Sequence, residues 1–411
     1  MAAPTTTVEV VFDETPVYDG IGFTLDDTEK GVLNNPYYVL DGHLNFIDVS
    51  SLVQEVSVTR GRSRQLDQYQ TGTATISFYN ASRALDPLNT ASAYYPYVIP
   101  RRYVRIKTNG IFIFAGLINS WSLTYDNYNM SYVNAQCSDA FAILANQTIN
   151  AYTPSEELTG SRINNVLNLS EISFTATSAS INTGSSTLGA FPVEDQTNAL
   201  NYLQQIEKSE QGFLYASASN TLTFKDRTTV LAQTGAVAFT DDGTGTSGYQ
   251  TLDVDTGDTL LYNRVVAQTV GGVAQIVSDA TSIATYDTIT LEATDLLNST
   301  DTEVLTIANL LLQQYKSPEV RFTGLSQMLS ALSDTNQNKL LSLDLTDLAT
   351  VLRTYTTGSP ASVTKYVIIE GITHSIKPME HTITYSLGAL QQAGFILDSG
   401  IFGLLDVGSL T

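Results

Sequence analysis

The strongest constraint on the fold is a series of short segments in which apolar and polar residues alternate. Between residues 45 and 135 these segments are VQEVSVTR, TGTATISFYN, RRYVRIKTN, GIFIFAGLINSW and MSYVNAQC, with turn residues between them. A period of two puts alternate side chains on opposite faces of a β-strand. Asn109-Gly110, which lies between two such segments, predicts a β-hairpin. Short strands with regular turns predict a sandwich or a small barrel.

The next part of the chain, up to the linker-like DDGTGTSG at 241–248, predicts helices mixed with short strands. Ser138 or Asp139 can cap a short helix, and Ser161 can cap a second one. The segment DQTNALNYLQQIEKSEQG predicts a longer helix, with Gly212 as the left-handed residue at its end. Two alternating strands follow this helix, and a helix with a hairpin is typical of α+β proteins.

A second strand-rich region starts near residue 249 and includes LLYNRVVAQTV, KYVIIEGITHSI and HTITYSLGAL. Within it, Thr300 and Glu303 predict a capping box for a helix over 302–315. This helix must stop near Pro318. The final segment, GFILDSGIFGLLDVGSLT, is apolar and contains four glycines, and we expect it to dock on another surface as an extended strap.

Bulk properties limit the class of protein. A chain of 411 residues predicts two to four domains, and its single cysteine, Cys137, excludes an intrachain disulfide. No secretory signal is visible, and the apolar run 111–118 is shorter than the roughly 18 residues of a membrane helix. We therefore expect a soluble protein without membrane insertion. A net charge of −21 argues against general nucleic-acid binding but would let DNA pass without adhering.

The positive charge is concentrated in one segment. Residues 60–107 hold eight of the 20 Lys and Arg residues but only two acids, a net charge of +6, whereas the other residues carry 12 basic against 39 acidic side chains, or −27. Arg60, Arg62 and Arg64 stand at every second position, so a continuous strand would place all three guanidinium groups on one face. Such a row can bind acidic groups of another surface, or it can be a solvated face that protects a strand edge from aggregation.

A search for reactive groups gives no enzyme class. The motifs G-x-S-x-G, H-E-x-x-H and the Walker loop are absent, and His374 and His381 lack a known metal-ligand spacing. The segment DVDTGD at 253–258 resembles a calcium loop but has neither its glycine nor its closing glutamate, so we interpret it as an acidic turn. We interpret Trp121 as a packing residue. We therefore expect no catalytic residue, no cofactor and no metal.

Tyrosine is abundant, with 22 residues, and clusters at Tyr37-Tyr38, at Tyr94-Tyr95 with Tyr97, and over 125–132. Tyrosine together with arginine is typical of protein interfaces. The alternative is that the loops of a β protein are simply rich in tyrosine.

One family resemblance extends over nearly the whole chain. The sequence RGRSRQLDQYQTGTATISFYNASRALDPLN, followed by YYPYVIPRRYVRI and FAGLINSW, resembles the minor tail proteins of long-tailed bacteriophages that form the baseplate hub. ALNYLQQIEKSEQGFLYASASNTLTFKDR is similar to the helix and hairpin of hub middle domains. LLYNRVVAQTVGG, VIIEGITHSI and FGLLDVGSLT also fit this family, whereas YNASRA at 79–84 is less charged than the turn that the family has there.

The resemblance implies an α+β, mainly β fold, with two β-barrel-like tube domains and an α+β domain between them. The expected units are an N-terminal extended arm (1–44), a first β-barrel-like hub domain (45–149), an α+β middle domain (150–248), a second β-rich hub domain (249–390) and a C-terminal extended tail (391–411).

The resemblance also implies a function: a structural virion protein of the tail tip, assembled in the host cytoplasm as a homotrimeric hub. Its expected partners are other copies of itself, the distal tail or tail-tube ring, the tape measure protein, and the spike or tail fibres, and DNA would pass through it. The alternatives are a hexameric distal tail ring, a glycan-binding tail adhesin and a wall-degrading enzyme. The residues that we expect at a subunit interface are Arg60, Arg62, Arg64, Arg101, Arg102, Tyr94 and Tyr95.

Overall fold

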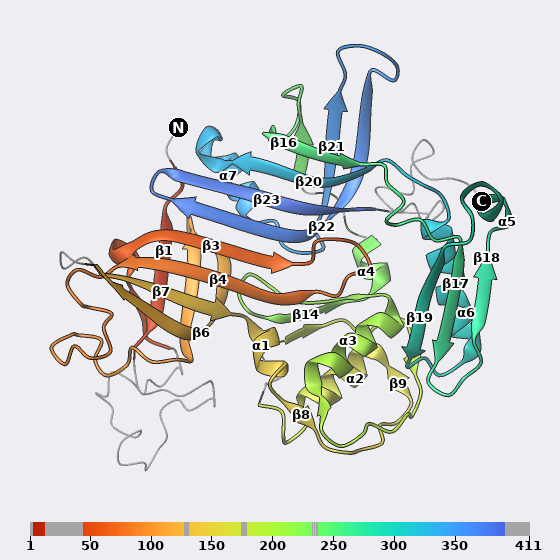
Figure 1. Ribbon diagram of the computed structural model, residues 1–411, viewed down its shortest axis with the longest axis horizontal. Coiled ribbons are helices and arrows are strands. Elements are labelled where there is room, and N and C mark those ends of the chain that lie inside the picture. The colour runs from red at the N-terminus through yellow and green to blue at the C-terminus, as the bar shows by residue number, and fades with distance from the viewer. Residues whose placement is uncertain are drawn as a thin grey trace.

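The computed structural model describes residues 3–12, 44–126, 131–173, 179–231, 233, 235 and 237–390, and all structural statements below refer to these residues. Most of the predicted N-terminal arm and the whole predicted C-terminal tail lie outside them. Figure 1 shows a large sheet, with a mixed region beneath one face and a smaller unit at its side.

Both strand-rich regions contribute to one 13-stranded sheet. β1 (Thr6–Val11) comes from the predicted N-terminal arm. Strands from the first region are β2 (Phe46–Asp48), β3 (Val53–Gly61), β4 (Gln70–Tyr79), β5 (Arg102–Thr108), β6 (Ile111–Tyr125) and β7 (Ser131–Ser138). Strands from the later part of the chain are β15 (Val237–Thr240), β16 (Thr251–Asp255), β20 (Arg321–Met328), β21 (Leu348–Thr354), β22 (Ser362–Lys377) and β23 (Glu380–Ala389). The main path of the sheet runs β16-β20-β23-β22-β3-β4-β7-β6-β5-β1-β2, and β15 joins it through β21.

The two halves of the sheet meet where β3 pairs antiparallel with β22, from Gly61 opposite Gly371 to Val56 opposite Ile376. Gly61 has a φ of +97°, and a Cβ there would lie 2.3 Å from the carbonyl oxygen of Glu370. Only glycine therefore fits this junction without displacing β22.

The α+β, mainly β class is confirmed. The path ends at β2 and β16, so the described strands form an open sheet and no closed barrel, while the predicted domain limits stay predictions.

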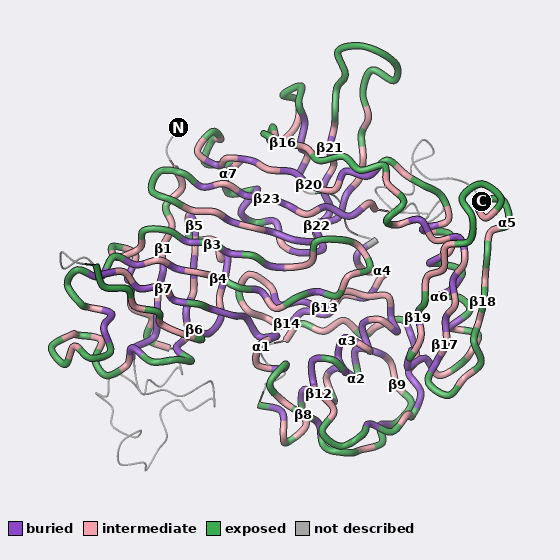
Figure 2. Tube along the Cα trace, in the orientation of Figure 1, coloured by how far each residue is buried: buried purple, intermediate pink, exposed green. Residues whose placement is uncertain are grey.

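Local sequence determines much of the first half. The hairpin predicted at Asn109-Gly110 joins β5 and β6, and both turn residues have positive φ, 50° and 79°. Alternation along β4 buries Ala74, Ile76 and Phe78. Trp121 packs against this core, as predicted. Figure 2 shows that buried residues follow the strands, whereas the loops that project from the sheet are exposed.

The mixed middle region lies beside this sheet. Its helices are α1 (Ala140–Leu144), α2 (Thr159–Leu167), α3 (Ala199–Glu210) and α4 (Arg227–Leu231). Its strands are β8 (Thr148–Ile149), β9 (Glu157–Leu158), β10 (Ala179–Ile181), β11 (Thr187–Leu188), β12 (Thr197–Asn198), β13 (Phe213–Ala216) and β14 (Leu222–Lys225).

Two of the predicted helix ends are wrong, although Asp139 does cap α1. α2 starts before Ser161, because the backbone N–H groups of Thr159 and Gly160 bond to carbonyls of residues 186 and 183 and need no side-chain cap. The left-handed residue after α3 is Gln211, not Gly212. A glycine is needed at 212 because a Cβ there would approach the Lys225 carbonyl oxygen to 2.9 Å.

A smaller unit interrupts the second strand-rich region. It contains β17 (Arg264–Thr269), β18 (Gln275–Ser278), α5 (Ala280–Tyr286), β19 (Thr290–Leu296) and α6 (Asp301–Tyr315), and it has its own apolar core. We call it the α6 unit. The Thr300 half of the predicted capping box is confirmed, since the Thr300 hydroxyl accepts a hydrogen bond from the N–H of Glu303. The Glu303 carboxylate accepts from the N–H of Thr187 and so ties the α6 unit to the middle region. α7 (Asp334–Leu341) follows and was not predicted.

Candidate functional site

The arginine-rich segment does not form the predicted row. β3 ends at Gly61, whose positive φ and the register shift beside it break the alternation, so only Arg60 lies within the strand. The prediction that Arg60, Arg62 and Arg64 share one strand face is therefore wrong. The first two side chains are buried against other parts of the chain, and the third is 60% exposed.

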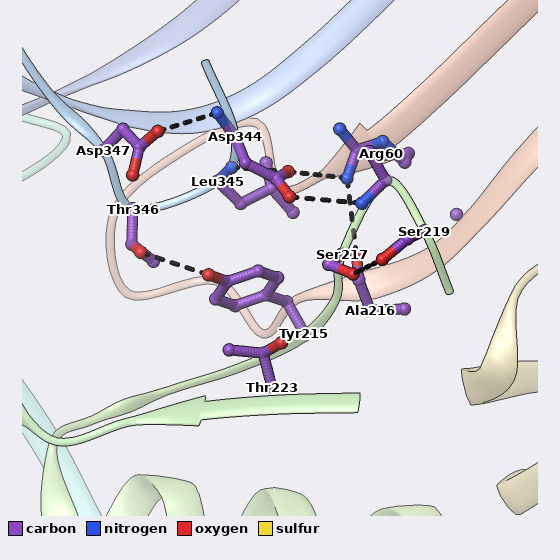
Figure 3. Close-up of polar contacts among 12 residues, drawn as sticks. Arg60, Tyr215, Ala216, Ser217, Ser219, Thr223, Asp344, Leu345, Thr346 and Asp347 are labelled. Carbon is purple, nitrogen blue, oxygen red and sulfur yellow. Dashed lines mark hydrogen bonds and ion pairs between the residues drawn. The ribbon is translucent and has the colours of Figure 1, made fainter. Parts of the chain in front are cut away.

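Arg60 lies under the sheet with a side chain that is 2% exposed (Figure 3). Its guanidinium donates to the Asp344 carboxylate over 2.8 Å and to the Ala216 carbonyl over 3.5 Å. Asp344 also accepts from the backbone N–H of Ala218 and of Leu345. This ion pair therefore links β3 of the first strand-rich region to β13 of the middle region and to the loop before β21.

Arg62 forms a second buried cluster. Its guanidinium binds the Glu370 carboxylate with two hydrogen bonds, of 2.6 and 3.1 Å, and lies over the Tyr69 ring, 4.5 Å from the ring centroid. The Tyr69 hydroxyl donates to the same carboxylate over 2.9 Å. A planar guanidinium suits this combination of a bidentate carboxylate and an aromatic face.

Burial and charge act together on the titration of this cluster. Burial lowers the pKa of Arg62, but Glu370, together with Tyr69 and Glu207, outweighs burial and raises that pKa above its ordinary value. Burial, reinforced by Glu370, raises the pKa of Tyr69 well above the usual range. Burial also raises the pKa of nearby Glu207 to about 7. The hydrogen bond that Glu207 accepts from the N–H of Leu214 opposes this effect. Arg62 therefore stays charged and Tyr69 stays neutral at physiological pH.

Four other basic side chains of the segment also have acidic partners in this chain. Arg64 pairs with Asp67, and Arg83 pairs with Asp86. Across the β1–β5 pair, Glu9 accepts from both Arg105 and Lys107. Burial alone would raise the pKa of Glu9, but these two hydrogen bonds hold it below its ordinary value.

Much of the positive charge of residues 60–107 is therefore paired with acidic side chains of the same chain. Three of the acidic partners, Glu9, Asp344 and Glu370, lie outside residues 60–107. They bring distant parts of an acidic chain onto its basic segment.

The remaining predicted interface residues differ in exposure. Arg101 is exposed and has a φ of 64°, and Tyr95 is 43% exposed. Arg102 is buried. Tyr94 is half-buried and stacks on Phe12, with ring centroids 4.4 Å apart.

Most of these residues belong to the β4–β5 loop, residues 80–101. Its apolar side chains include Leu88, which is 79% exposed, and Ile99, which is 39% exposed. The exposed ring of Tyr125 on β6 also contacts the loop, since its hydroxyl donates to the Asp86 carboxylate. We call this loop with Tyr125 the loop patch. Exposed apolar side chains near arginines are typical of protein interfaces.

The acidic partners were missed at the sequence level. In VIIEGI at 367–372, one glutamate interrupts an apolar run, and charged residues are rarely buried unless they are paired. That signal could have identified Glu370 as one half of a buried ion pair. The partner could not be found, because Arg62 lies 308 residues away along the chain.

The described part of the chain contains no candidate metal-binding cluster. No group of three or more His, Cys, Asp or Glu side chains there could hold a metal ion. His374 on β22 and His381 on β23 are both buried and form a ring-to-ring hydrogen bond, Nδ1 to Nε2, of 3.0 Å. Within the described ranges, no helix is long and apolar enough to span a membrane.

Comparison with solved structures identifies proteins that share the fold of this chain. Scans against protein families and against curated proteins give no match. Among solved structures, the tail protein from Neisseria meningitidis MC58 matches with a TM-score of 0.58 and 8% identity, over 93% of this chain and 95% of that one. The 43 kDa tail protein of prophage MuSo2 from Shewanella oneidensis matches with a TM-score of 0.55 and 11% identity, over 84% and 95%.

A third structure also matches with a TM-score above 0.5. The E. coli c3393 protein, described as a type VI secretion component similar to the T4 tail proteins gp27 and gp5, matches with a TM-score of 0.51 and 11% identity, over 82% of this chain and 74% of that one. This chain therefore shares its fold with phage tail proteins, as the sequence resemblance predicts.

Proposed function

We propose that this chain is a structural component of a phage tail tip, and that three copies form a baseplate hub. The hub would join the tail tube to a distal spike or fibres and would continue the DNA channel. The main support is the fold, which two phage tail proteins share over 95% of their own lengths. Fold alone does not determine function, so the architecture must support the same role.

The architecture is suited to a load-transmitting ring component. One sheet runs through both strand-rich regions, and the buried pairs Arg60–Asp344 and Arg62–Glu370 connect its halves to each other and to the middle region. Such connections favour a rigid body. The net charge of −21 repels phosphate, which favours the passage of DNA without binding.

We propose that the loop patch contacts the neighbouring copy or the tail ring. Leu88, Tyr95 and Arg101 supply exposed apolar, aromatic and basic groups there. Arg60 and Arg62 are used inside the subunit and Arg64 lies outside the loop patch, so Arg101 is the predicted arginine that the loop patch exposes. A ring contact pairs two different faces, so the loop patch needs a complementary acidic face, which an acidic chain can supply.

Native mass spectrometry of the purified full chain tests the oligomer. Three copies of the 44.5 kDa chain support the hub, whereas six copies would support a hexameric distal ring in its place. Leu88→Asp tests the loop patch, with Val273→Asp as the matched control, because these side chains are 79% and 67% exposed and Val273 lies in the β17–β18 turn of the α6 unit, outside the main sheet. Loss of the trimer in Leu88→Asp alone supports the proposed contact, whereas equal behaviour of both variants contradicts it.

We propose a structural rather than an enzymatic role. Buried titratable groups such as Arg62 and Glu370 neutralise each other, which suits packing rather than substrate chemistry. Electrophoresis of this chain in a gel that contains host cell walls, followed by refolding in the gel, tests this directly. A cleared band at the mass of this chain would support a wall-degrading enzyme, and retention on isolated wall glycan would support an adhesin.

A further inference from the structure

A cavity of about 730 Å³ lies where the main sheet, α3 and the α6 unit meet. Its walls include Ile368 of β22, Lys208 of α3, Leu291 of β19 and Leu310 of α6. Ligand sites in proteins typically measure about 300–1,000 Å³. The cavity is therefore large enough to hold several side chains of a bound segment.

Two walls of the cavity present uncovered apolar side chains. Leu66, in the loop after β3, is 37% exposed, and Leu310 is 39% exposed. Removing apolar surface from water is favourable in proportion to the area that is covered. An apolar occupant of the cavity would cover the exposed parts of both side chains.

The described chain ends on the wall of this cavity. Leu390 follows β23, lines the cavity and packs on the small core cluster of Val230, Leu348 and Ile368. Its backbone N–H bonds to the carbonyl of Tyr366. The described chain therefore leads to the cavity, and residue 391 is the next residue in the sequence.

Gln65 favours continuation of the chain into the cavity. Its Nε2 donates to the Ala389 carbonyl over 2.7 Å, while its Oε1 is buried and has no hydrogen-bond partner among the described residues. In an extended chain, the C=O of one residue and the N–H of the second residue after it point to the same side. The free Oε1 is therefore suited to accept the N–H of residue 391.

The sequence that follows has the composition of an occupant. Residues 391–411 contain no Lys or Arg and only two acids, and they carry seven large apolar residues between positions 395 and 405: Phe395, Ile396, Leu397, Ile401, Phe402, Leu404 and Leu405. An extended chain advances about 3.3–3.6 Å per residue, so Phe395 lies within roughly 18 Å of Leu390.

We propose that apolar side chains of residues 395–405 insert into this cavity of their own chain. The segment would cover Leu66 and Leu310 and would connect the α6 unit to the main sheet and to α3. This inference does not depend on the proposed tail function, since it rests on the cavity, on the path of the chain and on Gln65.

Disulfide trapping in the full-length chain tests this proposal. Leu310→Cys is combined in turn with Phe395→Cys, Leu397→Cys and Phe402→Cys. The control uses Leu305→Cys, which lies on the same helix, is 37% exposed and does not line the cavity. Native Cys137 is buried and should not compete. We expect at least one intrachain crosslink from residue 310 to form tenfold faster than its counterpart from residue 305. Equal rates, or crosslinks only between chains, would overturn the proposal.

Proteolysis gives a second measurement without crosslinking. Leu310→Glu places a charge in the cavity, and Leu305→Glu places the same charge on the exposed face of α6. If the segment is bound, chymotrypsin should cleave within 391–411 several-fold faster in Leu310→Glu than in Leu305→Glu or in the unaltered chain. Identical cleavage in all three proteins would show that the segment does not use the cavity.

Discussion

Replacing Arg62 by methionine tests whether the basic segment acts inside the subunit. Methionine keeps an apolar stem in place of the arginine stem but removes the guanidinium, so the Glu370 carboxylate, 1% exposed, loses its counter-charge. Removing one partner of a buried ion pair costs about 3–5 kcal/mol. We therefore expect the free energy of unfolding to fall by about that amount in Arg62→Met.

Arg64→Met is the matched control. Its side chain is 60% exposed and pairs with Asp67 over 3.4 Å. Such exposed pairs contribute about 0–1 kcal/mol, so the expected loss is below about 1 kcal/mol.

The double variant Arg62→Met with Glu370→Leu isolates the interaction. It removes both charges, so it should lose less than the sum of the two single variants.

Urea denaturation at pH 7, followed through the fluorescence of Trp121, the single tryptophan, measures all of these changes. If Arg62→Met lowers the urea midpoint no more than Arg64→Met does, the pair is not a buried connection between the halves of the sheet, and this reasoning is refuted.

Three further predictions concern other buried features. Burial lowers the pKa of His381 to about 4, so the folded state resists protonation there, and the contribution of His381 to stability should fall by up to about 3 kcal/mol as pH drops from 6.5 to 4. Urea midpoints of the unaltered chain and of His381→Phe at pH 7 and pH 5 measure this contribution, because the other titrating groups are common to both proteins; equal pH dependence in the two proteins would contradict it. Asp344→Asn removes the counter-charge of Arg60 and should lower the free energy of unfolding by about 2 kcal/mol. This loss is smaller than for a fully buried pair because the Asp344 side chain is 28% exposed. A urea midpoint equal to that of the unaltered chain would contradict this expectation. Gly110→Ala should destabilise the chain by about 1 kcal/mol, and Gly61→Ala should destabilise it more. Both glycines have positive φ, but only at Gly61 would a Cβ meet backbone atoms of another strand. The thermal midpoints of the two variants measure this difference, and equal midpoints would contradict the role of Gly61 at the junction.

Local sequence predicts the local elements well. Alternation identified strands of the main sheet, Asn109-Gly110 identified a hairpin, and Thr300 identified the start of α6. Each of these signals acts through neighbouring residues. The errors at Ser161 and Gly212 arose where distant backbone groups replaced the local cap or required a residue without a Cβ.

The candidate site was predicted less well because its contacts are long-range. The spacing of Arg60, Arg62 and Arg64 predicted a common face, but Gly61 breaks the strand between the first two. The partners Asp344 and Glu370 lie about 300 residues away, so no local pattern connects them to the arginines. We predicted acidic partners on another subunit or on the tail ring, whereas the partners of Arg60 and Arg62 lie in the same chain.

The central claim, a trimeric hub at a tail tip, is tested most directly by cryo-electron microscopy of the assembled tail. The account predicts three copies of this chain around the tail axis, with the loop patch of each copy against a neighbouring subunit or the tail ring. Six copies, an absence of the chain from the tail tip, or loop patches that face open solvent in every copy would contradict it.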